Sequence, residues 1–356
     1  MKAFHCGECG SLLFFENVQC VRCNHVLGFL PDVIDLSPLE SKGDGTWRAL
    51  APAAHGRIYR QCANGQQHQV CNWLVPAEDS NPFCVSCRLN EVIPDLTVPN
   101  NRELWQKLET AKRRVIYTLL RLRLPTEGAP LWRRHPLRFR FLSDPAGGPP
   151  VLTGHDEGVI TINVAEADDS ERERRRVTLR EPFRTLLGHM RHEVAHYYWE
   201  ELLVHTRQLH RFRKLFGDET RDYGAALQNY YQQGPPGDWQ MRHVSAYAAA
   251  HPWEDWAETS AHYFHIVDTV ETAASFGVTL RPRHPDAKAM TADPKNISAW
   301  NGGFDRILEN WLPLTYALNE LNRGMGLSDL YPFVLSAPAI EKLRFVHEVL
   351  NIRAQR

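Results

Sequence analysis

The strongest pattern of apolar and polar positions along the chain predicts an amphipathic helix at residues 103–124. Apolar side chains recur there at steps of three and four residues, as they do along one buried face of a helix: Leu104, Leu108, Ala111, Val115, Leu119 and Leu122. Basic side chains occupy other positions, and we interpret them as a solvated face rather than a nucleic-acid-binding stripe: Lys107, Lys112, Arg113, Arg114, Arg121 and Arg123.

Two short runs after this helix have the character of β-strands. Residues 137–142 alternate apolar and basic side chains, and residues 159–164 are rich in β-branched side chains. The second run is either an ordinary core strand or an edge strand that pairs with an extended peptide. Beyond Asp168 the pattern is mainly helical. The helices from Phe304 onward carry apolar positions expected in the core, with the alternative that these helices cover the cleft: Trp311, Leu314, Leu318 and Leu321. The second part of the chain is therefore predicted to be α+β and mainly helical, with a small sheet.

Length and composition divide the chain into two parts. A chain of 356 residues with 43% hydrophobic side chains is expected to form two domains. All eight cysteines lie between Cys6 and Cys87, and Pro94, Pro99 and Asn100 mark a boundary soon after them. We therefore predict a cysteine-rich module at residues 1–98 and a second domain at residues 99–356.

Charge and hydropathy argue against nucleic-acid and membrane partners. The 41 Lys and Arg residues nearly balance the 42 Asp and Glu residues, for a formal net charge of −1. The first residues hold no apolar stretch of the length of a secretion signal, and the sequence has no uninterrupted apolar run of about 18 residues, so we expect neither secretion nor membrane spanning. The prediction is a soluble cytoplasmic protein, in which clustered cysteines stay reduced and bind metal rather than form disulfides.

The cysteines form two groups of four. In the first group, two Cys-x-x-Cys pairs allow two tight turns to present four thiolates to one tetrahedral ion: Cys6, Cys9, Cys20 and Cys23. The second group has one such pair and two wider spacings: Cys62, Cys71, Cys84 and Cys87. We predict two structural zinc ribbons, with the alternatives that both groups share one ion or that His55 or His68 replaces a cysteine. Such ribbons also offer a surface for a protein partner.

A candidate catalytic metal site lies in the segment His192-Glu193-Val194-Ala195-His196. On a helix, residues four apart share a face, so both histidines can bind one zinc ion while Glu193 lies beside it. Zinc lowers the pKa of a bound water to about 7, and Glu193 would take its proton as the water attacks a carbonyl. His189, one turn earlier, is either a further ligand or a supporting or core histidine.

A third protein ligand is expected from residues 245–264. Pro252 suits the first turn of a helix, and on that helix Glu254, Glu258 and His262 share one face among aromatic side chains. A buried carboxylate among aromatic residues needs a partner, which a zinc ion would supply. The alternative is a solvated acidic turn at the start of the helix.

These motifs resemble those of gluzincin-type metallopeptidases, which combine a helical HExxH with a later glutamate ligand. They look most like the branch that includes anthrax lethal factor and the Mlc titration factor peptidases, in which a tyrosine lies seven residues before the ligand glutamate. Tyr247, Pro252 and Glu254 match that pattern. The resemblance implies a zincin-like fold, Glu254 as the third zinc ligand, and Glu258, one turn on, as a carboxylate that orients a histidine. His262 is expected to support the same site.

Nearly the whole chain also resembles a bacterial family of zinc-binding metallopeptidases with an N-terminal zinc ribbon. The likeness lies in five stretches: Cys71-Asn72-Trp73, Phe83-Cys84, Arg191-His192-Glu193, Leu215-Phe216-Gly217-Asp218-Glu219 and the segment from His251 to Glu258. The predicted function is a zinc-dependent peptidase that hydrolyses a peptide or amide bond, with Glu193 as general base and Tyr247 as donor to the developing oxyanion. The expected cofactors are one catalytic and two structural zinc ions. The alternative is a catalytically idle zinc-binding scaffold.

Overall fold

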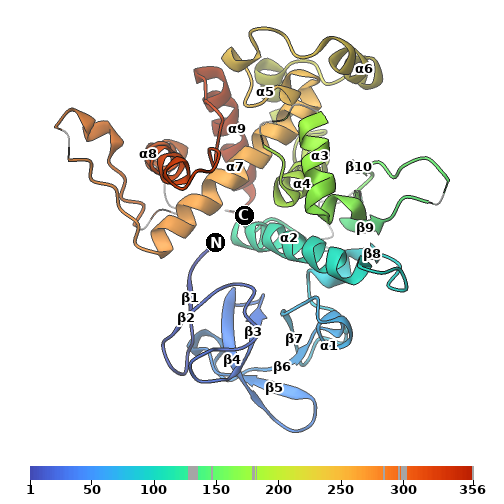
Figure 1. The fold of residues 1–356 in the computed structure, drawn as a ribbon, viewed down its shortest axis with the longest axis vertical. Helices are drawn as coiled ribbons and strands as arrows, with labels where there is room; N and C mark the ends of the chain where they lie inside the picture. The colour runs from blue at the N-terminus through green and yellow to red at the C-terminus, as the bar shows by residue number, and fades with distance from the viewer. Residues whose placement is uncertain are drawn as a thin grey trace. The chain divides into compact units, whose positions relative to one another are not determined.

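The computed structural model describes residues 1–126, 135–145, 147–178, 181, 183–283, 285–295, 297 and 303–354. The chain forms two compact units, and Figure 1 labels most of their α-helices and strands. The ribbon unit contains residues 2–121 and 125–175, and the helical unit contains Met1, residues 122–124 and residues 176–356. The fold class is the predicted one, because a module with two groups of four cysteines precedes a mainly helical region with a small sheet. The domain boundary between residues 98 and 99 stays a prediction.

Short antiparallel strands build the first part of the ribbon unit. β1 (Phe4–His5) pairs with β2 (Leu12–Leu13). A five-stranded antiparallel sheet follows in chain order: β3 (Val26–Leu30), β4 (Asp35–Ser41), β5 (Thr46–Ala49), β6 (Ile58–Gln61) and β7 (Leu74–Pro76). Its core includes Leu30, Leu39, Tyr59 and Leu74, whose burial stabilises strands of only a few residues. Three short helices complete this part: η1 (Pro52–Ala54), α1 (Ala63–His68) and η2 (Cys87–Leu89).

A second, four-stranded sheet lies in the same unit, in the order β10, β11, β9, β8. Its strands are β8 (Asn90–Val92), β9 (Arg138–Leu142), β10 (Gly154–Asp156) and β11 (Val159–Asn163). β11 pairs in parallel with β9 and antiparallel with β10, so Val159, Ile160 and Thr161 have partners on both sides. The expectation that this strand offers an edge to a peptide is therefore wrong at these residues, and the alternative of a core strand holds. The edge strand on this side is β10.

Helix α2 (Asn101–Arg121) forms where the apolar period predicts a helix, at slightly shifted bounds. The interpretation of its basic residues as a solvated face is wrong for two of them, because Lys112 is fully buried and Arg113 is only 5% exposed. Lys112 Nζ lies 3.0 Å from Oε1 of the buried Glu109, and Arg113 donates a hydrogen bond to the carbonyl oxygen of Val70. These partners make burial of the two charges tolerable.

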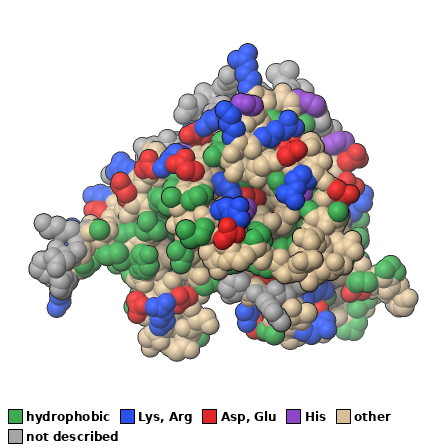
Figure 2. Space-filling view, turned by 90° about the horizontal axis from the view of Figure 1, so that it is seen from above, with side chains coloured by type: hydrophobic (Ala, Val, Ile, Leu, Met, Phe, Trp, Pro, Cys, Tyr) green, Lys and Arg blue, Asp and Glu red, His purple; other side chains and the backbone are tan. Residues whose placement is uncertain are grey.

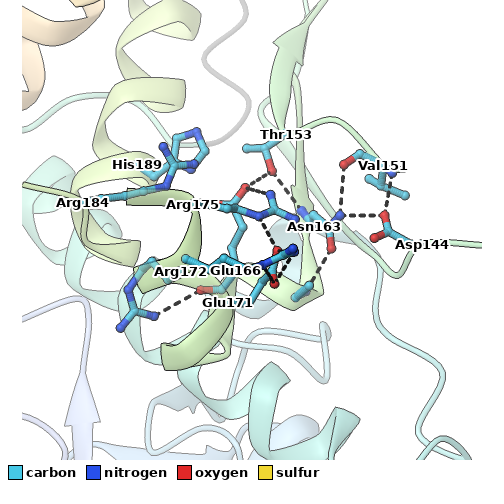
Figure 3. Close-up of polar contacts among 12 residues, drawn as sticks. Asp144, Val151, Thr153, Asn163, Glu166, Glu171, Arg172, Arg175, Arg184 and His189 are labelled. Atoms are coloured by element: carbon cyan, nitrogen blue, oxygen red, sulfur yellow. Dashed lines mark hydrogen bonds and ion pairs between the residues drawn. The ribbon is translucent and has the colours of Figure 1, made fainter. Parts of the chain in front are cut away.

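Partly buried polar contacts fix the chain where β11 ends (Figure 3). Asn163 caps the 3-10 helix η3 (Val164–Ala167) by accepting a hydrogen bond from Ala165 N at 2.9 Å, and its amide donates to Asp144 Oδ1 at 2.7 Å. Thr153 Oγ1 donates to the buried Glu166 at 2.6 Å. These contacts join the end of β11 and η3 to the segment between β9 and β10. Helix α3 (Asp169–Thr178) follows η3.

The helical unit is built around α4 (Leu186–Leu202) and α7 (Pro252–Ser275), which pack against each other (Figure 1). α7 also packs against α5 (Gln208–Phe216), α8 (Phe304–Gly324) and α9 (Ala337–Ala354). Aromatic rings fill part of the space between these helices, with Trp256 6.1 Å from Phe216 and 6.2 Å from Phe345 between ring centroids. The other elements are α6 (Tyr223–Gln233), η4 (Trp239–Met241), η5 (Tyr247–Ala249) and η6 (Pro285–Met290).

The predicted core positions of α8 are only partly buried. Trp311 and Leu314 are each 2% exposed, as expected, and Leu318 is half-buried. Leu321, however, is 67% exposed, so its assignment to the core is wrong. The last buried residue of α8 is Asn319, and the helix continues to Gly324 beyond its packed part.

The surface agrees with the near balance of charges in the sequence. Figure 2 shows Lys and Arg side chains interspersed with Asp and Glu on the face that it draws, without a large field of one sign. In the part of the chain that the structure describes, no helix is both long and apolar enough to cross a membrane.

Candidate metal centre

Helix α4 carries the two histidines of the HExxH segment on one buried face. Thr185 caps the helix by accepting a hydrogen bond from Gly188 N at 2.9 Å, one turn before the segment. His192 and His196 are 7% and 4% exposed, and their Nε2 atoms lie 3.1 Å apart. Two imidazole nitrogens therefore point to one place, as their spacing predicts.

Helix α7 brings a carboxylate to the same place. His251 caps this helix by accepting a hydrogen bond from Trp253 N at 3.1 Å, and Pro252 occupies its first turn, as expected. Oε2 of Glu254 lies 2.9 Å from His192 Nε2 and 3.5 Å from His196 Nε2. Glu254 is 1% exposed, so the acidic residue at the start of this helix is buried rather than solvated.

The donor atoms of His192, His196 and Glu254 fit a cation. One ligand atom from each lies within 4.8 Å of the others. Although Oε2 of Glu254 is buried beside two imidazoles, it makes no hydrogen bond within the described part of the chain. A buried carboxylate oxygen without a hydrogen bond is costly, and a metal ion would satisfy it. Two nitrogens and one carboxylate oxygen are a donor set that zinc uses.

Charges within the site reinforce one another. Burial alone would lower the pKa of His192, but the carboxylates of Glu254 and Glu258 raise it well above its usual value. Burial alone would raise the pKa of Glu254, but His196 and His192 lower it well below its usual value. Glu254 is therefore ionised at neutral pH and available to a cation.

Two further contacts orient these side chains. Oε1 of Glu258 lies 2.7 Å from Nδ1 of His192, and Ser245 donates a hydrogen bond to Oε2 of Glu258 at 2.5 Å. The hydroxyl of Tyr223, from α6, donates to Oε1 of Glu254 at 2.6 Å. Since a carboxylate only accepts, Nδ1 of His192 is the donor to Glu258, which leaves Nε2 for a metal.

Glu193 and Tyr247 lie next to the ligand atoms. Glu193 is 4% exposed, and its Oε1 lies 3.2 Å from Nε2 of His189, so His189 pairs with Glu193 rather than joining the ligand group. Burial would raise the pKa of Glu193, but His189 and the other imidazoles lower it. The ring of Tyr247 lies 6.0 Å from that of His192. Burial raises the pKa of Tyr247 well above its usual value, so its hydroxyl keeps its proton and can donate.

His262, which was expected to support the site, contacts two aromatic residues outside the ligand group. Its Nδ1 lies 2.5 Å from the hydroxyl of Tyr331, and its ring contacts Phe333 at 4.5 Å. Burial lowers the pKa of His262 to about 4, against the opposite effect of Glu258.

The cysteines gather in the two groups that the sequence predicts. In each group the four Sγ atoms lie within 4.8 Å of one another. The Sγ–Sγ distances include 3.6 Å from Cys6 to Cys23 and 3.7 Å from Cys71 to Cys84. Ligands are not shared between the groups, and His55 and His68 belong to neither of them among the described residues.

Helix α2 borders the second cysteine group. Sγ of Cys87 donates a long hydrogen bond, 3.9 Å, to Glu109. Burial alone would lower the pKa of Arg113, but the negative charge of Cys71 and Glu109 raises it. A basic side chain beside a group of thiolates offsets part of their mutual repulsion.

Two side chains of the site have no signal in the sequence. Tyr223 follows the helix cap Asp222 in a segment with no recognisable motif, and Ser245 lies in irregular chain before η5. Both act through the tertiary fold, which brings α6 and residue 245 to α7.

These observations define a protein with two groups of four cysteines in its N-terminal module and a buried group of His192, His196 and Glu254 that could hold a metal ion. A family described as "Putative zinc-binding metallo-peptidase" matches residues 101–349, and a zinc-ribbon domain family matches residues 3–98. The chain belongs to this metallo-peptidase family and carries an N-terminal zinc-ribbon domain.

Relatives cover almost the entire chain. Proteins from Mycobacterium bovis and from two strains of Mycobacterium tuberculosis, each called an uncharacterized protein, are 42% identical over 352 residues. The match spans 99% of this chain and 96% of each relative. No solved structure matches the chain.

Proposed function

We propose that this protein is a zinc-dependent peptidase of the gluzincin type, with His192, His196 and Glu254 as ligands of the catalytic ion. The observation that carries the proposal is that one ligand atom from each of these three residues lies close to the other two. One of these atoms, the buried Oε2 of Glu254, lacks a hydrogen bond that a metal ion would replace. The tyrosine seven residues before Glu254 supports a relation to the lethal factor branch, since its ring lies against His192.

The residues around the ion divide the chemistry between them. When bound, zinc supplies a Lewis acid that makes water acidic enough to lose a proton near neutral pH. Glu193, ionised and 4% exposed, accepts that proton and passes it to the leaving amine. Tyr247 donates a hydrogen bond to the oxyanion that develops on the carbonyl. Glu258 holds His192 in the tautomer that leaves Nε2 free for the metal.

The two cysteine groups are proposed to hold structural zinc. Four thiolates close the coordination sphere of each ion, so no position remains for substrate. The proposed location is the cytoplasm, where clustered thiols stay reduced and can bind metal. The ribbon surface is the proposed site for a protein partner, and the peptidase substrate is a peptide or protein.

Metal content tests the ligand assignment. We expect about three zinc ions per chain in the intact protein and two in the His192→Ala/His196→Ala variant, measured by elemental analysis. An unchanged zinc content would refute the proposed site. A second experiment tests catalysis. We expect the Glu193→Gln variant to retain its zinc but not to hydrolyse any member of a peptide library. Undiminished hydrolysis by that variant would exclude Glu193 as the base.

One contact favours the alternative of an idle zinc-binding scaffold. His189 Nε2 lies 3.2 Å from Glu193, so the base is engaged by a neighbour. The variant His189→Ala removes this neighbour and discriminates between the two functions. In a peptidase, the rate of hydrolysis should change, because the contact with His189 affects how readily Glu193 accepts a proton. A scaffold would show three zinc ions and no hydrolysis in either form.

A further inference from the structure

Helix α6 is attached to the helical unit without contributing to its core. None of its residues is buried. Glycines in the left-handed region lie on both sides of it, Gly217 at φ 104° and Gly234 at φ 77°, where other residues would be strained. Side chains of α6, including Ala226 and Asn229, line an open groove of about 1200 Å³ together with residues 248–252. The helix is therefore held in place by few contacts.

Tyrosine side chains provide contacts between α6 and the metal centre. The hydroxyl of Tyr223 donates to Oε1 of Glu254 at 2.6 Å, and its ring lies 5.6 Å from that of Trp253. The ring of Tyr230 lies 5.6 Å from that of Tyr247. Both tyrosines thus contact residues at the proposed active site.

The hydrogen bond of Tyr223 determines which oxygen of Glu254 faces the imidazoles. Either oxygen of a carboxylate can bind a cation, and rotation of the group exchanges them. A donor on Oε1 opposes that rotation and leaves Oε2, at 2.9 Å from His192 Nε2, toward the imidazoles. The phenol of Tyr223 is the donor in this contact, because a carboxylate only accepts.

We propose that Tyr223 is a positioning residue for Glu254, and that α6, which carries it, is docked on the unit by the same hydrogen bond. The inference rests on the proposed metal site. Because coupling between two equilibria is reciprocal, docking of α6 increases metal affinity by the same factor by which metal increases docking. Release of α6 would loosen Glu254 and weaken the site.

The test measures zinc affinity and the exchange of α6 in the full-length protein. Zinc binding at the HExxH site is titrated against a chromophoric chelator while the ribbon sites stay loaded. Removing a group that orients a ligand costs about 10–100-fold in metal affinity, so we expect a loss in this range for Tyr223→Phe. Tyr316→Phe is the control, because it removes a phenol hydroxyl from a residue of α8 that is 57% exposed. It should bind zinc as the wild type does.

Hydrogen–deuterium exchange of residues 223–233 supplies a readout that does not depend on activity. In the wild type, zinc should slow this exchange, and Tyr223→Phe should abolish the difference between the zinc-bound and zinc-free forms. Wild-type affinity in Tyr223→Phe, or an equal zinc effect on α6 in both proteins, would overturn the inference. If His192→Ala/His196→Ala keeps the zinc content unchanged, the proposed site itself fails. If that variant loses one zinc while Tyr223→Phe binds normally, only the inference fails.

Discussion

Glu258 and Glu254, one turn apart on α7, approach opposite nitrogens of a single imidazole. Oε1 of Glu258 lies 2.7 Å from Nδ1 of His192, and Oε2 of Glu254 lies 2.9 Å from Nε2 of the same ring. A ring held at Nδ1 by a carboxylate presents its other nitrogen in a defined direction and is a stronger donor to metal. The arrangement gives a role to each of the two glutamates that lie four residues apart on one face of α7.

The first prediction concerns Glu258. Glu258→Gln keeps the size of the side chain but removes the charge that supports His192, so we expect zinc affinity at the HExxH site to fall by about 10–100-fold. Competition with a chromophoric chelator measures the change. Glu309→Gln, which neutralises an exposed glutamate of α8, should have no effect. Equal zinc affinities of Glu258→Gln and the wild type would show that Glu258 does not support the metal site.

The second prediction concerns a buried ion pair next to the site. Asp255, which follows Glu254, is fully buried, and its Oδ2 lies 2.5 Å from Nζ of Lys342 on α9. Lys342→Met leaves the charge of Asp255 without its main partner and should lower the free energy of unfolding by about 3–5 kcal/mol. Urea denaturation measures it.

A double variant separates the cost of an unpaired charge from the loss of packing. Lys342→Met combined with Asp255→Asn removes both charges and should be more stable than Lys342→Met alone. If the double variant is no more stable than the single one, the two charges are not coupled. His243, whose Nδ1 lies 3.0 Å from Asp255 Oδ2, stays unchanged throughout.

The third prediction concerns the second cysteine group. Helix α2 contacts this group through Glu109 and through Arg113, which donates to Val70 in the loop before Cys71. Cys84→Ser should therefore weaken metal binding and speed amide exchange in residues 101–113, because metal binding and folding are linked. Hydrogen–deuterium exchange with mass spectrometry follows the change.

The first cysteine group supplies the matched control for this experiment. Cys9 is half-buried and has Cys20 and Ser11 as neighbours at 3.6 and 3.4 Å. Cys9→Ser should speed exchange around residues 6–23 and leave residues 101–113 unchanged. Faster exchange of residues 101–113 in both variants would mean that α2 depends on the ribbon module as a whole.

The fourth prediction is a pH dependence in the loop before α6. Hydrogen bonds from Arg213 lower the pKa of Glu219 below its usual 4.5, against the effect of burial. A lowered carboxyl pKa stabilises the fold above the unfolded-state pKa, and this contribution is lost as pH falls through 4.5 and below. Because Arg213 is 47% exposed, we expect less than about 1 kcal/mol.

Glu219→Gln tests this sign. Its free energy of unfolding should fall short of the wild-type value at about pH 7, and the two values should approach each other only below the lowered pKa, toward about pH 3. Denaturant titrations at both pH values give the difference. A gap of the same size at both would show that Glu219 acts through packing rather than charge.

Spacing along single helices and turns made much of the site predictable. The histidines of α4 lie four residues apart, and the cysteine groups gather as their local order suggests. Tyr223 and Ser245 could not be predicted, because each reaches α7 from a separate segment whose packing leaves no periodic trace. The partner of His262, Tyr331, lies 69 residues away in the chain and is hidden for the same reason.

Burial of charged side chains was the main source of wrong expectations in the fold. Lys112 and Arg113 occupy polar positions of the α2 pattern, which assigns them to solvent. Glu109 pairs with the charge of Lys112, and the carbonyl oxygen of Val70 accepts a hydrogen bond from Arg113. A hydrophobicity pattern does not register such compensation, since it counts each side chain without its neighbours.

The short strand β8 joins the cysteine-rich module to the sheet that follows it. Asn90–Val92 begins just after Cys87 and pairs in parallel with β9. A chain shortened to begin at residue 99 would lose this strand, and the backbone N–H and C=O groups of β9 would be left unpaired along one side. Exposed strand edges recruit further strands from other molecules. We therefore expect the N-terminal module to limit aggregation of the remainder of the protein, independently of any partner or substrate that its surface binds.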